Sequence, residues 1–295
     1  MDEITYFNRY TQRLEQEKVL GERWVKWFYG HDYRRHAGWM NLAAGHLLSR
    51  LYGAYMNSAR SKRLIAPFIR DYAIKQDEFV MEDFANFNQF FIRRFKPQAR
   101  TWVEGKRLAA PCQARYLGYA VNRPTNTYPV KGEDLAPQLL LRDNPWAKYF
   151  VGGPLLIARL CPVDYHRFHY GDNGRVMDQF TLPGRLHSVN PWALKTIPQL
   201  FAHNEKQITI IQTENFGYLA YLEVGALGVG KIVQTNLGPE VKRGEEKGYF
   251  LFGGSTVIIL GEPQRWQPSE DLLTHTAAAQ ETLINLGDEV GVALT

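Results

Sequence analysis

The sequence Gly-Gly-Ser-Thr at residues 253–256 lies between an aromatic run, residues 249–252, and an aliphatic run, residues 257–260. Both flanking runs are β-prone, and two glycines between such runs are typical of a hairpin turn. The same glycines leave the carbonyl before Ser255 uncrowded, so that the serine hydroxyl can attack its own backbone. Other residues of the chain are needed to distinguish the hairpin turn from the reactive serine.

Composition places the chain among ordinary globular proteins. Its 295 residues and 45% hydrophobic content are sufficient for a full core. The longest apolar runs are far shorter than the roughly 20 residues of a membrane-spanning helix. The N-terminus lacks the basic start and apolar stretch of a signal peptide, so we expect a protein of the cytosol or of a cytosolic surface. The net charge of +5 favours an anionic partner, and on charge alone membrane phosphates and nucleic acid both fit.

The first 80 residues or so differ from the rest, being rich in Trp, Tyr, Arg, Lys and His. Apolar residues such as Leu47, Leu51 and Tyr55 follow helical spacing, which predicts a helical N-terminal region. Aromatic and aliphatic residues occur there beside cations: Trp24, Lys26, Trp27, Phe28, Tyr29, Arg60, Lys62, Arg63, Leu64, Ile65 and Phe68. This composition is typical of an interfacial membrane helix, although aromatics packed on the main domain beside solvated cations explain it equally well.

From about residue 109 the pattern changes to short β-prone runs separated by Gly, Pro and Asn. We therefore expect strands at residues 155–160, 207–212, 218–224 and 257–260. The helical N-terminal region and the β-rich remainder together predict an α+β fold.

Two histidines, His166 and His169, follow the segment Cys161-Pro162-Val163-Asp164-Tyr165. A metal site is one interpretation, but no convincing third ligand lies nearby. A single core histidine with a hydrogen-bond partner is another. The chain's two cysteines, Cys112 and Cys161, supply neither a disulfide framework nor a zinc array, and we interpret both as small buried residues.

Taken together, the motifs resemble the phosphatidylserine decarboxylase family in content and in order. They lie at residues 87–93, 128–132, 164–169, 183–190, 204–206, 224–226 and 247–256. The resemblance covers about two-thirds of the chain and continues at residues 281–282 and 287–291. A string of ordered motifs is far more specific than any one of them.

The resemblance implies a pyruvoyl enzyme that makes its own cofactor. Ser255 Oγ would attack the Gly254 carbonyl to give an ester, and β-elimination would release residues 1–254 and convert residue 255 to a pyruvoyl group. That group would accept the electrons left when carbon dioxide departs, the role of pyridoxal phosphate elsewhere. The substrate implied is phosphatidylserine and the product phosphatidylethanolamine.

The resemblance also implies roles for the histidines: His169 as base toward the serine, and His166 in the decarboxylation step. The family orients its base with an aspartate in a Pro-x-Asp segment, but the matching position here holds Gln113. A glutamine carries no negative charge and can present its amide donor instead of an acceptor. The comparable Asp→Asn change in serine proteases lowers kcat by about 10⁴.

Compensation for that loss is therefore expected if the chain cleaves itself. The carboxylates nearest to the histidines in sequence are Asp164, Asp172 and Asp178. If the missing charge limits cleavage, Gln113→Asp should accelerate it. Gly-Gly before the serine, where many relatives have Leu-Gly or Val-Gly, should not hinder the acyl shift.

Three functions remain open at this point. The first is a phosphatidylserine decarboxylase that cleaves itself at Ser255; the second is an uncleaved relative that binds anionic phospholipid; the third is a pyruvoyl decarboxylase of another amino-acid-containing substrate. A Ser/His hydrolase is set aside, because the chain lacks G-x-S-x-G.

For the first function we expect residues 1–85 to be a membrane-associating helical region and residues 86–295 a β-rich decarboxylase domain. The protein should then be peripheral on the cytoplasmic face of the cell membrane. Its expected partners are phosphatidylserine, the anionic membrane surface, the two chains of one precursor and a second copy in a homodimer, with no nucleic acid and no metal.

Overall fold

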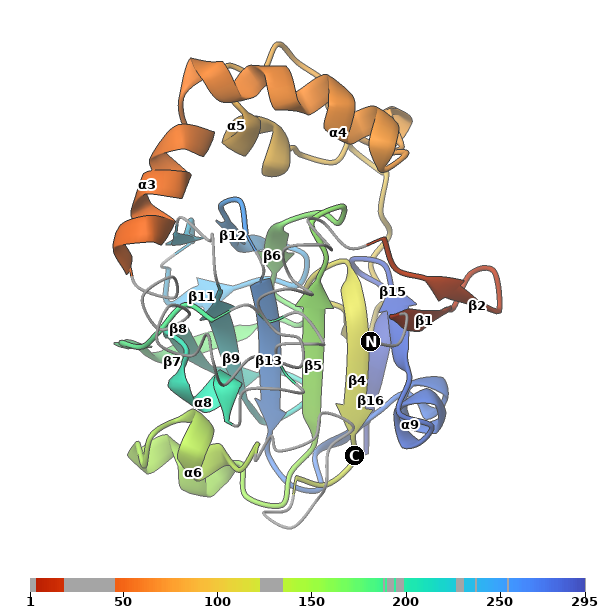
Figure 1. Ribbon diagram of the computed structural model, residues 1–295. Coiled ribbons are helices and arrows are strands. Elements are labelled where there is room, and N and C mark those ends of the chain that lie inside the picture. The colour runs from red at the N-terminus through yellow and green to blue at the C-terminus, as the bar shows by residue number, and fades with distance from the viewer. Residues whose placement is uncertain are drawn as a thin grey trace.

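The computed structural model describes residues 4–18, 46–122, 135–187, 189, 194, 199–226, 231–236, 238–253 and 255–294. It shows a β-sheet domain with a group of helices over one end (Figure 1). The described helices, with η for 3₁₀ turns, are α3 (His46–Met56), η1 (Ala59–Leu64), α4 (Ile65–Asp71), η2 (Gln76–Glu78), α5 (Phe87–Phe91), α6 (Pro137–Leu140), η3 (Pro145–Tyr149), α8 (Leu200–His203) and α9 (Glu270–Ala277).

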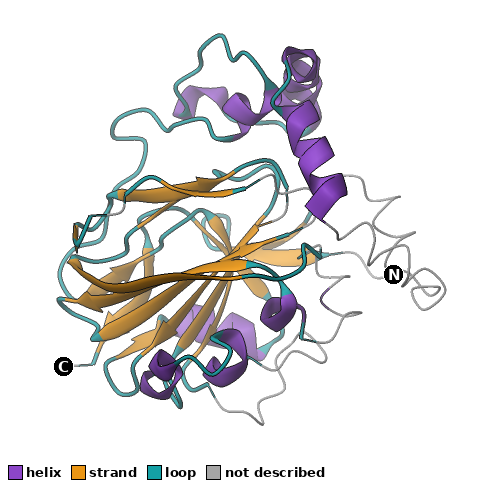
Figure 2. Cartoon of the chain, turned by 90° about the vertical axis from the view of Figure 1, so that its left-hand side faces the viewer, coloured by secondary structure: helices purple, strands orange, loops and turns teal. Residues whose placement is uncertain are grey.

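Strands make up most of the regular structure, as Figure 2 shows. They are β1 (Thr5–Asn8), β2 (Arg13–Gln16), β3 (Arg107–Ala109), β4 (Ala114–Tyr119), β5 (Leu155–Leu160), β6 (Arg167–His169), β7 (Gly174–Leu182), β8 (Lys206–Thr213), β9 (Tyr218–Gly225), β10 (Ile232–Gln234), β11 (Glu240–Val241), β12 (Glu246–Phe250), β13 (Ser255–Gly261), β14 (Trp266–Pro268), β15 (Glu281–Ile284) and β16 (Glu289–Ala293). The α+β class is confirmed, and so are the four strands expected from sequence, which correspond to β5, β8, β9 and β13.

A large sheet forms the centre of the molecule, in the order β11-β7-β8-β9-β13-β5-β4-β15-β1-β2. Its middle strands β5 and β13 are buried along their whole length, because core clusters cover both faces of the sheet. Aliphatic residues on both faces of a strand are expected where a sheet is covered on both sides. One of the two covering layers is a small sheet, β10-β12-β6, which packs over β13 and carries the histidine segment.

The expectation of helix throughout residues 1–85 is wrong at its beginning. Residues 5–16 form the hairpin β1–β2, and β1 pairs in parallel with β15, with Tyr6 opposite Glu281. Ile4 and Tyr6 are buried while Thr5 is exposed, a period of two that suits a strand with one face covered. The aromatic residues Trp24, Trp27, Phe28 and Tyr29, with Lys26, lie outside the described residues.

Helices do follow at residues 46–91, here called the helical lobe. Its core is a cluster of aromatic residues from α3, α4 and α5, with Phe68 edge-on to Phe87 and Phe90. Phe252, from the loop before β13, packs into the same cluster against Phe87 and Phe91. The lobe therefore covers the end of the sheet at which β13 begins, as Figure 1 shows. Among the described residues, no helix is long and apolar enough to span a membrane.

Candidate active site

Ser255 is the first residue of β13 and is fully buried. It pairs with Leu160 of β5 on one side and with Gly225 of β9 on the other. Strand pairing on both sides fixes its backbone, and the alternation of β13 turns its side chain to the same face as Val257 and Ile259, toward the small sheet. Gly254, the other residue of the expected cleavage site, lies outside the described residues, as do residues 128–132 and Asn190 of the motifs.

His166, which directly precedes β6 of the small sheet, meets the serine. Its Nδ1 lies 3.1 Å from Ser255 Oγ, and its Nε2 lies 2.9 Å from the carbonyl oxygen of Cys161. A carbonyl can only accept, so Nε2 carries the proton and Nδ1 is left as the acceptor for the serine hydroxyl. The imidazole is therefore in the tautomer that can take a proton from Ser255.

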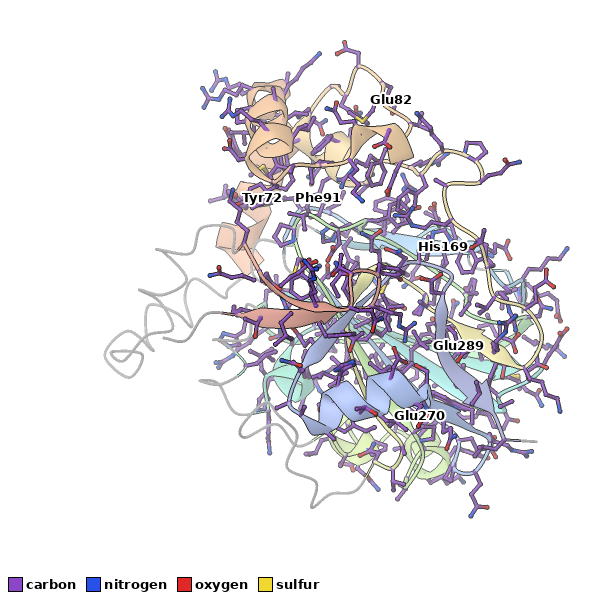
Figure 3. The ribbon with its side chains drawn as sticks, turned by 90° about the vertical axis from the view of Figure 1, so that its right-hand side faces the viewer. Tyr72, Glu82, Phe91, His169, Glu270 and Glu289 are labelled. Atoms are coloured by element: carbon purple, nitrogen blue, oxygen red, sulfur yellow. The ribbon has the colours of Figure 1, made fainter. Side chains whose placement is uncertain are left out.

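The environment of His166 keeps this imidazole neutral. Burial, with a smaller contribution from the Arg93 guanidinium, lowers the pKa of His166 to about 3. Phe91 of α5 stacks on the ring at 3.9 Å between centroids, and so the helical lobe forms a wall of the site. Figure 3 shows Phe91 at the lower side of the lobe, facing the β-domain that holds His169.

His169 has different partners. Its Nδ1 is 2.9 Å from the carbonyl oxygen of Gly244, and its Nε2 is 3.3 Å from the hydroxyl of Tyr165. It is 9% exposed, and burial lowers its pKa. Of the two histidines, the structure brings His166 and not His169 to hydrogen-bond distance from Ser255.

Gln113 faces an arginine. Its Oε1 accepts a hydrogen bond from Arg100 Nη2 at 3.0 Å, and the same nitrogen donates to Glu78 at 2.6 Å. The expected arrangement of Gln113 beside the serine and its base is therefore not found among the described contacts. The segment is nevertheless close to His169, whose backbone N–H donates to Pro111 at 2.8 Å.

The structure shows the partners of the three carboxylates that could compensate for the missing charge at Gln113. Asp178 accepts from Trp146 Nε1, and Asp172 pairs with Arg243 and Asn215, so both are engaged away from the histidines. Asp164 is 2% exposed and accepts from the backbone N–H of Cys161 at 2.6 Å. It alone of the three is tied to the residue that orients His166.

Gln113→Asp is expected to change the rate of self-cleavage by less than about tenfold, against the roughly 10⁴ that an orienting aspartate contributes in serine proteases. The reason is that Arg100 would pair with the new carboxylate. Appearance of the small fragment after synthesis, followed on gels, measures the rate. Gln98→Asp, an exposed position in the same stretch, is the control. A much larger acceleration by Gln113→Asp would show that the missing charge limits cleavage.

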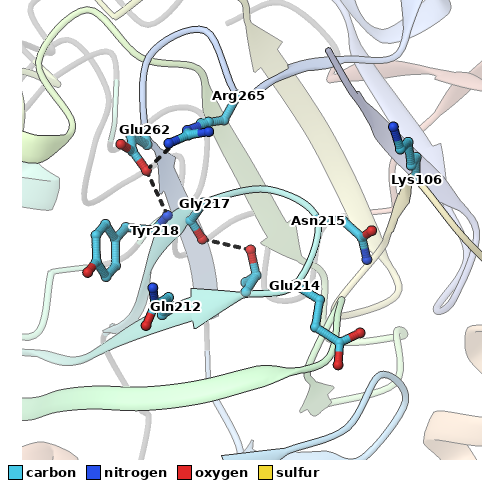
Figure 4. Close-up of a pocket in the computed structure, with 9 residues that line it drawn as sticks. Lys106, Gln212, Glu214, Asn215, Gly217, Tyr218, Glu262 and Arg265 are labelled. Carbon is cyan, nitrogen blue, oxygen red and sulfur yellow. Dashed lines mark hydrogen bonds and ion pairs between the residues drawn. The ribbon is translucent and has the colours of Figure 1, made fainter. Parts of the chain in front are cut away.

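A polar pocket of about 320 Å³ lies elsewhere (Figure 4). Glu262, which directly follows β13, lines it together with Arg265 and Tyr218. Glu262 accepts from the backbone N–H of Tyr218 at 3.1 Å and lies 3.7 Å from Arg265. The pocket thus lies at the opposite end of β13 from Ser255 and takes no part in the site.

Two features of the site escaped the sequence reasoning. Cys161 and Cys112 are buried and free, as expected, but the important atom is the Cys161 backbone carbonyl, which no side-chain pattern marks. Pro162 was the available signal, since it predicts a turn there. Phe91 could have been found only as a member of the motif at residues 87–93. Among the described residues, no three His, Cys, Asp or Glu side chains gather as a metal site would require.

Comparison with known proteins adds to this geometry. Residues 87–291 match the family model described as phosphatidylserine decarboxylase. A protein of Clostridium kluyveri is 37% identical over 98% of this chain and 99% of its own length. One of Chlamydia muridarum is 38% identical over 98% and 97%, and one of Clostridium novyi is 35% identical over 99% and 100%. All three carry the name phosphatidylserine decarboxylase proenzyme.

Proposed function

Because the chain belongs to the phosphatidylserine decarboxylase family, we propose that it is a proenzyme that cleaves itself between Gly254 and Ser255 and then decarboxylates phosphatidylserine. The observation that carries the proposal is the 3.1 Å contact of Ser255 Oγ with His166 Nδ1. This contact supplies a buried serine with a neutral base in the required tautomer. The base and the serine both lie inside the segment that matches the family.

In the proposed cleavage, the proton of the Ser255 hydroxyl passes to His166 Nδ1 while Oγ attacks the Gly254 carbonyl. The peptide C–N bond breaks as the proton passes from His166 to the departing nitrogen of residue 255, and an ester forms. Elimination across Cα and Cβ of residue 255 then releases the Gly254 carboxylate, and water displaces ammonia from residue 255 to leave the pyruvoyl group. General-base assistance of this kind typically contributes about 10² to 10⁴ in rate.

The family resemblance implies that His169 takes that proton; we propose His166 instead. With Gln113 bonded to Arg100, no aspartate from that segment is available to activate His169. His166 already has its Nε2–H bonded to the Cys161 carbonyl, and its free nitrogen faces the serine. A role for His166 in the later decarboxylation is proposed as well, since the imidazole lies beside residue 255.

The surroundings of residue 255 fit a pyruvoyl group. Residue 255 loses its backbone nitrogen in this reaction, but residues 256–260 keep their pairing with both β5 and β9 and hold residue 255 in place. Ser255 and His166 are fully buried, and Phe91, which packs on His166 and on Phe252, limits the access of bulk water to the ketone once it has formed. When present, the group would supply the electron acceptor for loss of carbon dioxide.

Intact mass and enzyme assay test the proposal together. A fragment of residues 255–295 with a blocked amino terminus, and release of carbon dioxide from phosphatidylserine micelles but not from free serine, are expected. A single uncleaved species that still binds anionic lipid would replace the proposal with a catalytically inactive lipid-binding relative. Cleavage with turnover of free serine alone would point to another substrate.

We also propose a peripheral position on the cytoplasmic face of the cell membrane, with residues 1–85 as the membrane-associating region and residues 86–295 as the decarboxylase domain. Leu51 and Tyr52 of α3 are 60% and 43% exposed, and Arg60 and Arg63 nearby are exposed cations. Exposed apolar residues beside cations suit an anionic bilayer surface. The homodimer expected from sequence is part of the proposal, and sedimentation equilibrium tests it.

Charge reversal should weaken binding to anionic vesicles. Arg60→Glu with Arg63→Glu removes two cations worth about 1 kcal/mol each near such a surface, so affinity should fall at least about tenfold. Arg107→Glu with Arg175→Glu, exposed residues of β3 and β7, makes the same change in net charge outside the helical lobe. Vesicle co-sedimentation measures both pairs, and equal losses would mean that the lobe is not the contact surface.

A further inference from the structure

The turn at residues 161–164 determines where the Cys161 carbonyl points. That oxygen accepts from the backbone N–H of Asp164 at 2.9 Å and from His166 Nε2 at 2.9 Å. The Asp164 carboxylate closes the turn from its other end, since Oδ2 accepts from the Cys161 N–H at 2.6 Å. Backbone and side chain of one residue thus hold Cys161 in place.

The carboxylate is itself anchored. Asp164 Oδ2 also accepts from Nη1 of Arg115, a residue of β4 that is 5% exposed. The guanidinium of Arg115 lies over the Tyr6 ring of β1 and 3.5 Å from Glu17. Buried carboxylates are stable when paired and hydrogen-bonded in this way.

We propose that Asp164 is the positioning residue for His166, acting through the Cys161 backbone. The aspartate of a serine-histidine system normally bonds the imidazole directly and selects its tautomer. Here a carbonyl makes that bond, and Asp164 fixes the carbonyl. This indirect arrangement orients the imidazole and selects its tautomer, which Gln113 does not do. It places no negative charge beside the imidazole.

The experiment compares Asp164→Asn with Glu281→Gln. Glu281 pairs with Arg159 in the same buried charge network but does not touch the turn. Asparagine can still accept from the Cys161 N–H but cannot pair with Arg115 as an ion. Cleavage is expected to slow at least about tenfold in Asp164→Asn and to stay near the native rate in Glu281→Gln.

A spectroscopic measurement separates positioning from folding. In a Ser255→Ala background, which cannot cleave, nitrogen-15 NMR of labelled histidine should show His166 protonated at Nε2. Asp164→Asn should give a mixture of tautomers, and Glu281→Gln should not. Equal cleavage of both variants and an unchanged Nε2–H signal would overturn the proposal. The inference rests on the proposed cleavage, but the tautomer can be read even in a chain that never cleaves.

A different observation concerns Arg93, which follows α5 and is 2% exposed. Its Nη2 donates to the carbonyl of Val163 at 3.0 Å, and its guanidinium lies 4.3 Å from the ring centroid of Phe79. Its Nε and Nη1 have no hydrogen-bond partner among the described residues. Burial lowers the pKa of Arg93 to about 10, so the side chain remains a cation at neutral pH.

A buried guanidinium with two unsatisfied donors beside the reacting centre calls for an anion. Arg93 lies 4.9 Å from the ring centroid of Phe90, and the next residue, Phe91, stacks on His166, so the guanidinium packs on the same helix as the imidazole. We infer that Arg93 binds an anionic group of the substrate headgroup, either phosphate or carboxylate. Ser255, His166 and Arg93 are all buried, so substrate must displace the same cover, the α5 segment with Phe91.

The test uses Arg93→Gln with the exposed neighbour Arg94→Gln as control. Binding of phosphatidylserine and phosphatidylethanolamine micelles to the cleaved proteins is measured beside KM and kcat. Loss of affinity for phosphatidylserine alone would identify the carboxylate, which the product lacks, and loss for both lipids the phosphate. A KM and lipid affinities equal to those of Arg94→Gln would overturn the inference. Native protein without decarboxylase activity would instead count against the proposed function.

Discussion

Ser255→Ala should leave a single full-length chain that releases no carbon dioxide from phosphatidylserine. The hydroxyl is both the nucleophile of the proposed cleavage and the source of the pyruvoyl group, so no slower route replaces it. Ser255→Cys should still cleave, more slowly, since a thiol can form the corresponding thioester. Intact mass and carbon dioxide release measure both variants.

The control is Ser269→Ala, a change at another buried serine of the same fragment, which accepts a hydrogen bond from Arg9 Nη2 at 3.2 Å. It should cleave normally, although its stability falls slightly. A fragment starting at residue 255 from the Ser255→Ala chain would mean that a protease makes the cut. Normal decarboxylation by that variant would contradict the pyruvoyl assignment.

His166→Ala should slow cleavage by about 10² to 10⁴, the usual contribution of a general base. His169→Ala should have a smaller effect, since its ring contacts Gly244 and Tyr165 rather than Ser255. His203→Ala, at an exposed position, is the control. Fragment formation in a pulse-chase experiment gives the three rates. Loss of cleavage in His169→Ala with normal cleavage in His166→Ala would restore the assignment implied by the family resemblance.

The pH dependence of cleavage provides an independent check on His166. Its folded pKa of about 3 is below the ordinary value of about 6.5, so the folded imidazole stays unprotonated on mild acidification. The cleavage rate should therefore show no fall near pH 6.5 while the fold is intact. The unfolded chain binds a proton at this position first, so stability itself declines as pH falls below about 6.5. A rate that titrates near 6.5 would mean that a solvated imidazole is the base.

The sequence was informative about local pattern and about the chemistry of the serine. The β-prone runs became strands β5, β8, β9 and β13 because their apolar residues suit both faces of a covered sheet. Helices at residues 46–91 followed from helical spacing. Hairpin β1–β2 could not be predicted, because β1 joins the sheet by parallel pairing with β15, a strand at the far end of the chain.

The residues of the site could be predicted from sequence, but their contacts could not. Motif order named Ser255, His166, His169 and the substituted position Gln113. It could not give the tautomer of His166, which depends on a backbone carbonyl five residues earlier. Nor could it show that Gln113 bonds to Arg100, since that contact depends on how the segment that follows the lobe packs against the β-domain. Backbone groups and contacts between distant segments leave little trace in residue type.

The position of β13 has a consequence for the mature protein. Residues 255–295 supply an interior strand of the large sheet, β13, and a second one, β15, between β4 and β1. The two products of the cut are therefore interleaved rather than docked side by side. Such subunits cannot be exchanged between molecules without unfolding both. A damaged small chain therefore cannot be replaced. Each mature enzyme retains the two fragments of the single precursor chain from which it folded.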